Sequence, residues 1–202
     1  MIQADQLTAL CLHSYGTPYA LTPHMDLIAA RGTTYLNSYC NSPVCGPSRA
    51  SMMTGRLPSN VGVYDNAGEF LSSEPTYAHY LRTLGYQTSL VGKMHFVGPD
   101  QLHGFERRLT TDIYPSDFSW TADWSQYEEE YAPSLMSLLS VVDAGTCERS
   151  LQCDYDDHVF NMAKQELFDI ARSDDERPFF VHASFTHPHN PFVTTQDFWD
   201  LY

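Results

Sequence analysis

Apolar runs that each follow a helical pattern give the clearest indication of the fold class. The run at residues 179–185 follows the longest helical pattern, at residues 156–173, and is typical of an inner parallel strand. Residues 86–91 form a second such run, after a helical pattern at 76–84. Helices that alternate with apolar strands predict an α/β fold with a mostly parallel central sheet flanked by helices. Further predicted elements are helices at 22–32 and 48–55, a strand at 33–39, a strand end within 2–12, and a long loop at 100–124.

The chain has 202 residues and shows no internal repeat or linker, so we expect one domain over residues 1–202. Its first strand is barely present, and no obvious ending follows Trp199. We therefore expect the N-terminal part of a single domain, with the first strand and the C-terminal portion incomplete. No apolar run approaches the roughly 20 residues that cross a bilayer, and residues 1–5 lack signal-peptide features, so we expect no membrane partner.

Charge and cysteine usage narrow the classes of partner. The chain carries 25 Asp and Glu against 11 Lys and Arg, for a net charge of −14. Nucleic-acid phosphates call for clustered basic residues, so this composition argues against a nucleic-acid partner. The acidic surface either aids solubility or favours a cationic substrate. Five scattered cysteines form no disulfide framework, which predicts a reducing, cytoplasmic setting.

Residues 45–56 carry the most specific motif, Cys45-Gly46-Pro47-Ser48-Arg49 with a closing Thr-Gly-Arg. Arg49 lies one helical turn beyond Cys45, so its guanidinium can face back toward that side chain. The start of a helix also directs backbone N–H groups and the positive end of the helix dipole toward an anion. The alternative interpretation is that Cys45 is an unreactive, buried free cysteine before a helix.

A second cluster follows the predicted strand at 86–91. In an extended segment, residues two apart point the same way, so Lys93 and His95 can share one site. Ligands of α/β sheets bind beyond the carboxyl ends of strands, which is where this pair lies. The alternative is two ordinary surface residues.

The motif at 45–56 resembles the sulfatase signature C-x-P-S-R-x(4)-T-G-R, in which a formylglycine-generating enzyme oxidises the cysteine to formylglycine. The resemblance implies an alkaline-phosphatase-like sulfatase fold and a sulfuric ester hydrolase. It also implies a covalent sulfo-formylglycine intermediate. One hydroxyl of the hydrated aldehyde attacks sulfur, and the other then collapses to the aldehyde and expels sulfate.

The same resemblance implies catalytic roles for individual residues. Cys45 becomes the nucleophile, and Arg49 holds the modified side chain. Lys93 binds a sulfate oxygen, and His95 contacts the formylglycine diol. Residues 184–192 look like the sulfatase P-H-x-P segment, which makes His189 the general acid, with His187 as its near rival.

Sulfatases also bind a divalent cation, and the resemblance implies Asp5 and the formylglycine from Cys45 as ligands. Many members have two consecutive acidic residues here, whereas Gln6 follows Asp5 in this chain. A hard oxygen site suits Ca²⁺ first, with Mg²⁺ or Mn²⁺ as alternatives. The later acidic pair and lysine of sulfatases have no match after His189. We therefore expect the isolated chain to bind metal poorly and to hydrolyse little.

Within the sulfatases, four segments resemble choline-sulfatases in particular: 39–43, 64–70, 92–105 and 110–115. This resemblance implies choline sulfate as the substrate, and we predict Asn66, Trp120 and Trp124 as substrate-binding residues. For each aromatic residue of the loop, packing beneath the loop is the alternative. Aromatic faces attract a trimethylammonium group, and Trp120 is the best single candidate. Tyr114 and Phe118 are further aromatic candidates, and Asp112 or Asp123 could add charge. The sequence leaves open whether the protein forms a homo-oligomer.

Two other functions stay open. Phosphonate and phosphate ester hydrolases share the broad fold, and some also use formylglycine. A non-enzymatic alternative is an inactive fragment or binding module that keeps the anion pocket.

Overall fold

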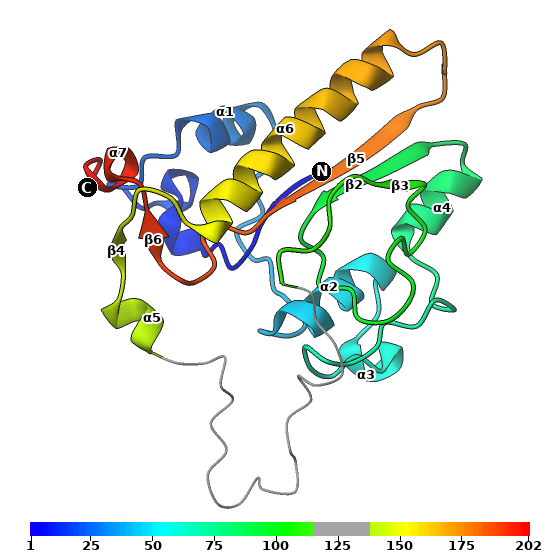
Figure 1. The fold of residues 1–202 in the computed structure, drawn as a ribbon, viewed down its shortest axis with the longest axis horizontal. Coiled ribbons are helices and arrows are strands. Elements are labelled where there is room, and N and C mark those ends of the chain that lie inside the picture. Colours follow the sequence, from blue (N-terminus) through cyan, green and yellow to red (C-terminus); the bar gives the residue numbers. More distant parts are fainter. Residues whose placement is uncertain (115–137) are drawn as a thin grey trace, which may run out of the picture.

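The computed structural model describes residues 1–114 and 138–202. Its centre is a four-stranded sheet in the order β1 (Ile2–Ala4), β5 (Phe179–Phe185), β2 (Gln87–Gly92) and β3 (Arg107–Arg108). Every pairing in this sheet is parallel, and β5 lies between β1 and β2 (Figure 1). The predicted parallel α/β architecture is confirmed.

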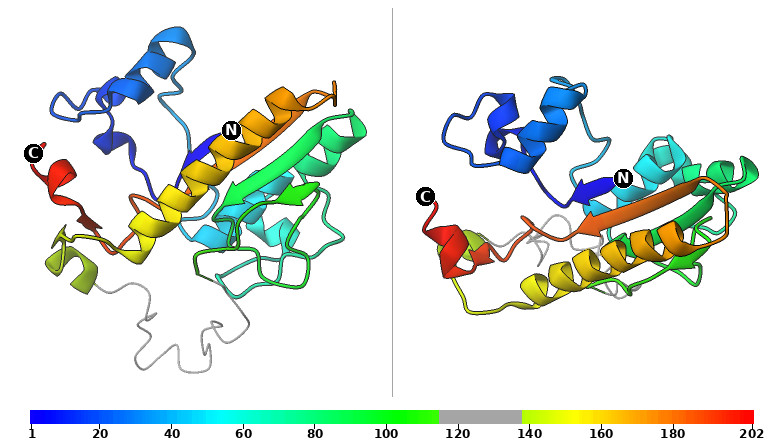
Figure 2. Two further views of the ribbon diagram at one scale, coloured as in Figure 1. Left: turned by 45° about the horizontal axis from the view of Figure 1, so that its top comes forward. Right: turned by 90° about the horizontal axis from the view of Figure 1, so that it is seen from above.

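Helices cover both faces of the sheet. The longest, α6 (Leu151–Arg172), runs along β5 on one face (Figure 2). On the other face lie α2 (Cys45–Thr54), α3 (Pro58–Val61) and α4 (Tyr77–Thr83). The buried carboxylate Glu166 ties α6 to the sheet, because it accepts a hydrogen bond of 2.5 Å from Ser89 Oγ and pairs with Arg107.

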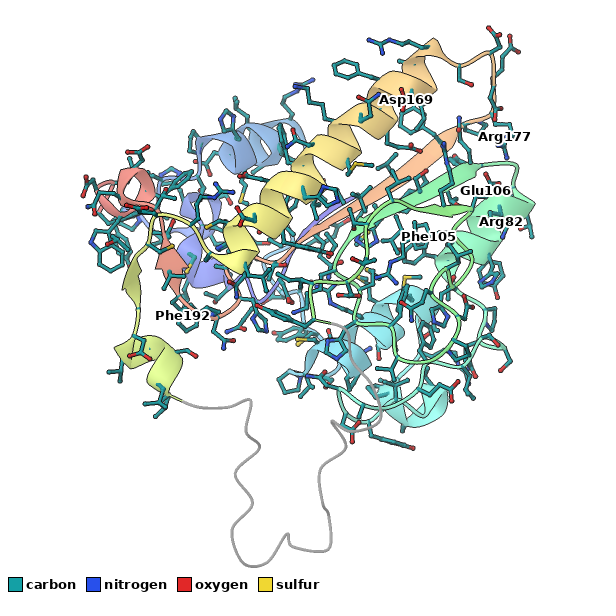
Figure 3. The ribbon with its side chains drawn as sticks, viewed as in Figure 1. Arg82, Phe105, Glu106, Asp169, Arg177 and Phe192 are labelled. Carbon is teal, nitrogen blue, oxygen red and sulfur yellow. The ribbon has the colours of Figure 1, made fainter. Side chains whose placement is uncertain are left out.

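The apolar core lies between the sheet and the helices α2 and α4. Met53 of α2, Leu90 of β2 and Phe105 are each at most 1% exposed and pack in one cluster. At the end of the sheet where β5 begins, Glu106 instead pairs with the exposed side chains of Arg82 and Arg177 (Figure 3). That end is therefore a solvated, charged edge.

The remaining described elements lie around this body. After β1 come two short 3-10 turns, η1 (Ala9–Cys11) and η2 (His13–Tyr15), and then α1 (Pro23–Arg31). Later elements are α5 (Leu139–Val142), β4 (Gly145–Thr146), β6 (Val193–Thr194) and α7 (Gln196–Trp199), with β4 and β6 paired in parallel. Within the described ranges, no helix has the length and apolar character to span a bilayer.

One predicted strand is wrong, and the predicted loop at 100–124 contains the short strand β3. Residues 33–39 form no strand, and Tyr35, Leu36 and Tyr39 are more than 70% exposed. Aromatic and β-branched residues favour strands only where a neighbouring strand and a buried face are available, and this segment has neither. Two helices were predicted too short, since α2 begins at Cys45 rather than 48 and α6 at Leu151 rather than 156.

Candidate functional site

The candidate site lies at the carboxyl edge of the parallel sheet. Asp5 directly follows β1, and its N–H donates to the Phe185 carbonyl at 3.1 Å. Lys93 directly follows β2, and its N–H donates to the Ser184 carbonyl at 3.0 Å. Because the parallel strands end together, residues far apart in the sequence meet at this edge.

Three buried charges form the centre of the site. The Lys93 ammonium lies 2.5 Å from Asp5 Oδ2, and Arg49 Nη2 lies 3.2 Å from Asp5 Oδ1. Burial raises the pKa of Asp5, but the nearby Arg49 and Lys93 outweigh burial and hold this pKa below its usual value. Asp5 is therefore a carboxylate, and the three groups carry a net positive charge that suits an anion.

Arg49 also joins the helix to the sheet. Its Nη1 donates to the Lys93 carbonyl at 2.6 Å and to Ser184 Oγ at 3.0 Å. Since Arg49 is only 3% exposed, these bonds hold α2 in register with β2 and β5. Arg49 was predicted to face Cys45, and its hydrogen bonds give it a structural role as well, because they link α2, β2 and β5.

Cys45 is the first residue of α2 and is partly buried. Burial raises the pKa of its thiol, so the unmodified cysteine is protonated near neutral pH. The next backbone N–H, from Gly46, donates to Asn66 Oδ1 at 2.8 Å. A Cβ at Gly46 would lie 3.1 Å from the Asp65 carbonyl, so a glycine allows this close approach.

His95 reaches the same region through Asn66. Its Nε2 lies 3.0 Å from the Asn66 carbonyl, and burial lowers the pKa of His95, which favours the neutral ring. The predicted extended geometry of this segment is wrong, because His95 has φ +59°. Lys93 and His95 therefore reach the site through a turn rather than as alternate residues of a strand.

His189, and not His187, lies beside Cys45 and Asp5. A His189 ring nitrogen belongs to the group formed with Cys45 Sγ and an Asp5 oxygen. Burial, and then the charge of Lys93, lower the pKa of His189. The His187 ring instead lies 2.7 Å from Asp156, whose hydrogen bond raises the pKa of His187.

Only some of the predicted substrate-binding side chains lie within the described residues. Trp120, Trp124, Phe118 and Asp123 lie outside the described residues. Tyr114 is described, and its ring centroid lies 5.3 Å from Lys93 Nζ and 6.1 Å from the His189 ring centroid. Asp112, suggested as a source of charge for a substrate, uses its Oδ2 to accept hydrogen bonds from two backbone amides and from Arg108.

A metal ion would find only part of its ligands here. Among residues 1–114 and 138–202, an Asp5 oxygen, Cys45 Sγ and a His189 nitrogen lie within 4.8 Å of one another. A hard cation such as Ca²⁺ takes about six to eight oxygen ligands. Asp5 supplies carboxylate oxygen, and formylglycine would replace the Cys45 sulfur by oxygen. The two predicted ligands therefore fit a hard cation but do not complete its coordination.

Comparison with known proteins decides the family. The family model described as Sulfatase matches residues 1–201. The chain belongs to the sulfatase family. Sulfatases generally use a divalent metal ion and formylglycine, and the fold here is the alkaline-phosphatase-like sulfatase fold, present as a partial domain.

Two curated sulfatases align with the whole chain. It is 49% identical over 205 residues to the choline-sulfatase of Rhizobium meliloti (strain 1021) and 28% identical over 219 residues to the arylsulfatase of Clostridium perfringens (strain 13 / Type A). The chain covers 40% and 45% of these relatives. It therefore spans less than half the length of either sulfatase.

Solved structures show the same fold. The phosphonate monoester hydrolase of Agrobacterium radiobacter aligns with a TM-score of 0.69 at 22% identity, covering 100% of this chain and 43% of that one. A protein in complex with its substrate D-glucosamine-2-N,6-O-disulfate aligns with a TM-score of 0.65 at 23% identity, covering 94% and 34%. At these identities, the likeness concerns the sulfatase fold alone.

Two residues that hold this site together were not predicted to do so. Ser184 was placed at the end of the predicted strand and the start of the histidine segment without a role of its own, yet its hydroxyl accepts from Arg49. Asp156 was assigned only to a helix, yet it binds the segment that carries the histidines. The available signals were a polar residue within the pattern of a buried strand, Ser184, and an acidic residue at the start of a predicted helix, Asp156.

Proposed function

We propose that the whole protein is a sulfuric ester hydrolase that acts on choline sulfate, and that this chain supplies its nucleophile and much of its anion site. The observation that carries the proposal is the grouping of Cys45, Asp5 and His189 beside the buried cations Lys93 and Arg49. The 49% identity to a choline-sulfatase supports the choice of substrate.

In the proposed reaction, Cys45 is first converted to formylglycine and hydrated. One hydroxyl attacks sulfur, so a new O–S bond forms as the ester O–S bond breaks. The leaving oxygen takes a proton from His189 and departs as the alcohol. The second hydroxyl then loses its proton, the aldehyde re-forms, and sulfate departs with the oxygen it received. Water hydrates the aldehyde for the next cycle.

Each described side chain has a defined task in this scheme. Lys93 binds a sulfate oxygen, and its charge stabilises the negative charge that builds up at sulfur. Arg49 holds the modified side chain and the two strand ends. The Nδ1 atom of His189 lies 2.7 Å from the Asn190 carbonyl, so Nδ1 keeps its proton. The ring must therefore be doubly protonated when it acts as the acid, and it donates the proton on Nε2.

A divalent cation, Ca²⁺ in our proposal, would be held by Asp5 and the formylglycine oxygen and would neutralise sulfate charge. Asn66 holds the backbone next to the nucleophile and contacts the substrate. Trp120 and Trp124 are proposed to bind the trimethylammonium group by cation–π attraction.

The first experiment is co-expression of the whole protein with a formylglycine-generating enzyme, followed by peptide mass spectrometry. Conversion lowers the mass of the Cys45 peptide by roughly 18 Da, or leaves it near the thiol mass when hydrated. The converted protein should hydrolyse choline sulfate. Cys45→Ala should abolish turnover, whereas the matched variant Cys40→Ala, at an exposed cysteine, should retain it.

The same preparation separates the competing functions. Sulfate, phosphate and phosphonate esters of one alcohol are compared by kcat/KM. A preference for the phosphorus esters would replace the sulfatase assignment with a phosphonate or phosphate ester hydrolase. An unmodified thiol, with sulfate binding but no turnover, would leave an anion-binding module.

A further inference from the structure

Asp156 holds the segment that leads to His189. Its Oδ1 accepts from the Thr186 N–H at 2.7 Å, and its Oδ2 accepts from the His187 N–H at 2.9 Å. The same Oδ2 lies 2.7 Å from His187 Nδ1. One carboxylate near the start of α6 therefore binds three groups in the turn that follows β5.

Asp112 holds the corresponding segment after β2. Its Oδ2 accepts from the Met94 N–H at 3.0 Å and from the His95 N–H at 2.7 Å. Arg108 Nη2 lies 2.8 Å from this oxygen. The Asp112 side chain is only 8% exposed, so water competes little with these bonds.

The two carboxylates share one arrangement. Each accepts hydrogen bonds from two consecutive backbone amides and from one side chain, at the point where the chain leaves a central strand. An ionised carboxylate offers several lone pairs and accepts charge-assisted hydrogen bonds, which are shorter and stronger than neutral ones. Both held segments carry residues of the proposed reaction.

The geometry points to Asp112 and Asp156 as positioning residues of the reaction: Asp112 fixes Lys93 and His95, and Asp156 fixes His189. This inference rests on the proposed function. It assigns His187 to the anchoring of the turn rather than to proton transfer, because its Nδ1 is engaged by Asp156.

The segment held by Asp112 has a conformation that local sequence does not favour. His95 has φ +59°, in the left-handed region that non-glycine residues seldom adopt. The Asp112 carboxylate binds the amide of this very residue, so it compensates the unfavourable backbone. Displacing a reacting group by about 1 Å can lower a rate on the order of 100-fold. Loss of either carboxylate should therefore reduce catalysis without removing any group that touches sulfate.

The test compares Asp156→Asn with Asp157→Asn in the converted whole protein. Asp157 is the next residue of α6, is 64% exposed, and pairs with Arg149. In Asp156→Asn, the amide group presents N–H where a carboxylate oxygen accepted bonds. We expect kcat to fall at least about tenfold, with KM changed less than about threefold, because the turn holding the proton donor loosens. Asp157→Asn should match the parent protein.

Asp112→Asn should also lower kcat, and His187→Gln should cause a smaller loss because both backbone bonds to Asp156 remain. If Asp156→Asn fails to fold, His187→Gln provides the test. An unchanged kcat, or a rise in KM alone, would overturn the proposal. Complete loss of turnover in His187→Gln would instead identify His187 as the proton donor and also overturn it.

A second readout does not depend on turnover. Backbone amide NMR of the whole protein should show the Thr186 and His187 protons moved upfield and exchanging faster in Asp156→Asn, but unchanged in Asp157→Asn. Added inorganic sulfate should shift the His189 signals of the parent chain more than those of Asp156→Asn. If the parent protein hydrolyses no ester, the proposed function fails, and these spectra alone decide the positioning role. Equal spectra in parent and Asp156→Asn would refute it.

Discussion

At the scale of single residues, the site consists of two buried cations paired with one buried carboxylate. Lys93 is 1% exposed and Arg49 is 3% exposed, and both lie against the one carboxylate of Asp5. Buried charges are tolerated only when they are paired and hydrogen-bonded. One carboxylate between two cations satisfies this condition and still leaves positive charge for an anion. The same arrangement therefore stabilises the chain and favours the binding of an anion.

Asp5→Asn tests this balance. In sulfate-free buffer the variant should lose roughly 3–5 kcal/mol of unfolding free energy, because Lys93 keeps its buried charge without a partner. Inorganic sulfate should then raise the melting temperature of Asp5→Asn more than that of the parent chain, since the anion takes the place of the carboxylate. Thermal unfolding across a sulfate titration measures both effects. Asp157→Asn is the control, and equal sulfate responses in parent and Asp5→Asn would contradict the prediction.

Sequence motifs predicted most of these charged residues, but not how they contact one another. Cys45, Lys93 and His189 carry recognisable local signals, and the structure brings them to one edge. The hydrogen bond from Arg49 to Ser184 joins residues 135 positions apart, so no local pattern contains it. Such contacts depend on strand register, which forms only when the sheet assembles.

At the scale of elements, the junction between β2 and β5 controls where Lys93 lies. Gly92 pairs with Ser184 at the last step of the ladder and has φ +103°. A Cβ at Gly92 would lie 1.9 Å from the Ser184 carbonyl oxygen. The strands can approach this closely, and the chain can turn toward Asp5, only because this position has no side chain.

Gly92→Ala is therefore expected to be far more damaging than its matched control, Gly85→Ala. Gly85 also has positive φ, +86°, but no atom lies within 4 Å of its Cβ position, so this control carries backbone strain alone, about 1–3 kcal/mol. Gly92→Ala adds a backbone clash and should lose at least about twice as much. Urea unfolding of both variants measures the difference. Equal losses would show that the strands separate easily and that the close approach matters little.

The elements also show where sequence patterns are informative. The predicted strand at 179–185 matches β5 fully, because a central strand is paired on both sides and its apolar pattern reflects real burial. The predicted strand at 33–39 has similar residue types but no partner among the described strands. Aromatic and β-branched residues alone did not separate the two cases, and tertiary pairing decided between them.

At the scale of the whole molecule, a buried histidine links the layers of the fold. His182 of β5 is fully buried, with Nδ1 2.8 Å from the Tyr77 hydroxyl of α4 and Nε2 2.9 Å from Gln3 Oε1 of β1. Burial, and then the charge of Arg49, lower the pKa of His182 to about 3. The ring is therefore neutral whenever the protein is folded near neutral pH.

This neutral ring makes the stability of the whole molecule depend on pH. In the unfolded chain an ordinary histidine binds a proton below about pH 6.5, whereas the folded chain resists protonation of His182 down to about pH 3. The unfolded state thus binds more protons in this window, so the stabilisation is full above pH 6.5 and is lost as pH falls. Near pH 5, one such group changes the unfolding free energy by up to about 1.4 kcal/mol per pH unit. Other groups, including His95, His187 and His189, add slopes of both signs, so the difference between variants is the informative quantity.

Urea unfolding between pH 5 and pH 7.5 isolates the contribution of His182, because aspartates with ordinary pKa values stay charged there. His182→Gln should be less stable than the parent chain at pH 7.5 but should lose less stability on acidification. Tyr77→Phe is the matched control, since it removes a hydrogen bond of the same ring and leaves the ring itself; its stability should fall with pH as steeply as in the parent chain. If His182→Gln and Tyr77→Phe show the same slope, protonation of His182 does not limit the acid stability of the fold. A shallower slope in His182→Gln alone would show that the ring joining α4, β5 and β1 must remain neutral for these layers to stay packed.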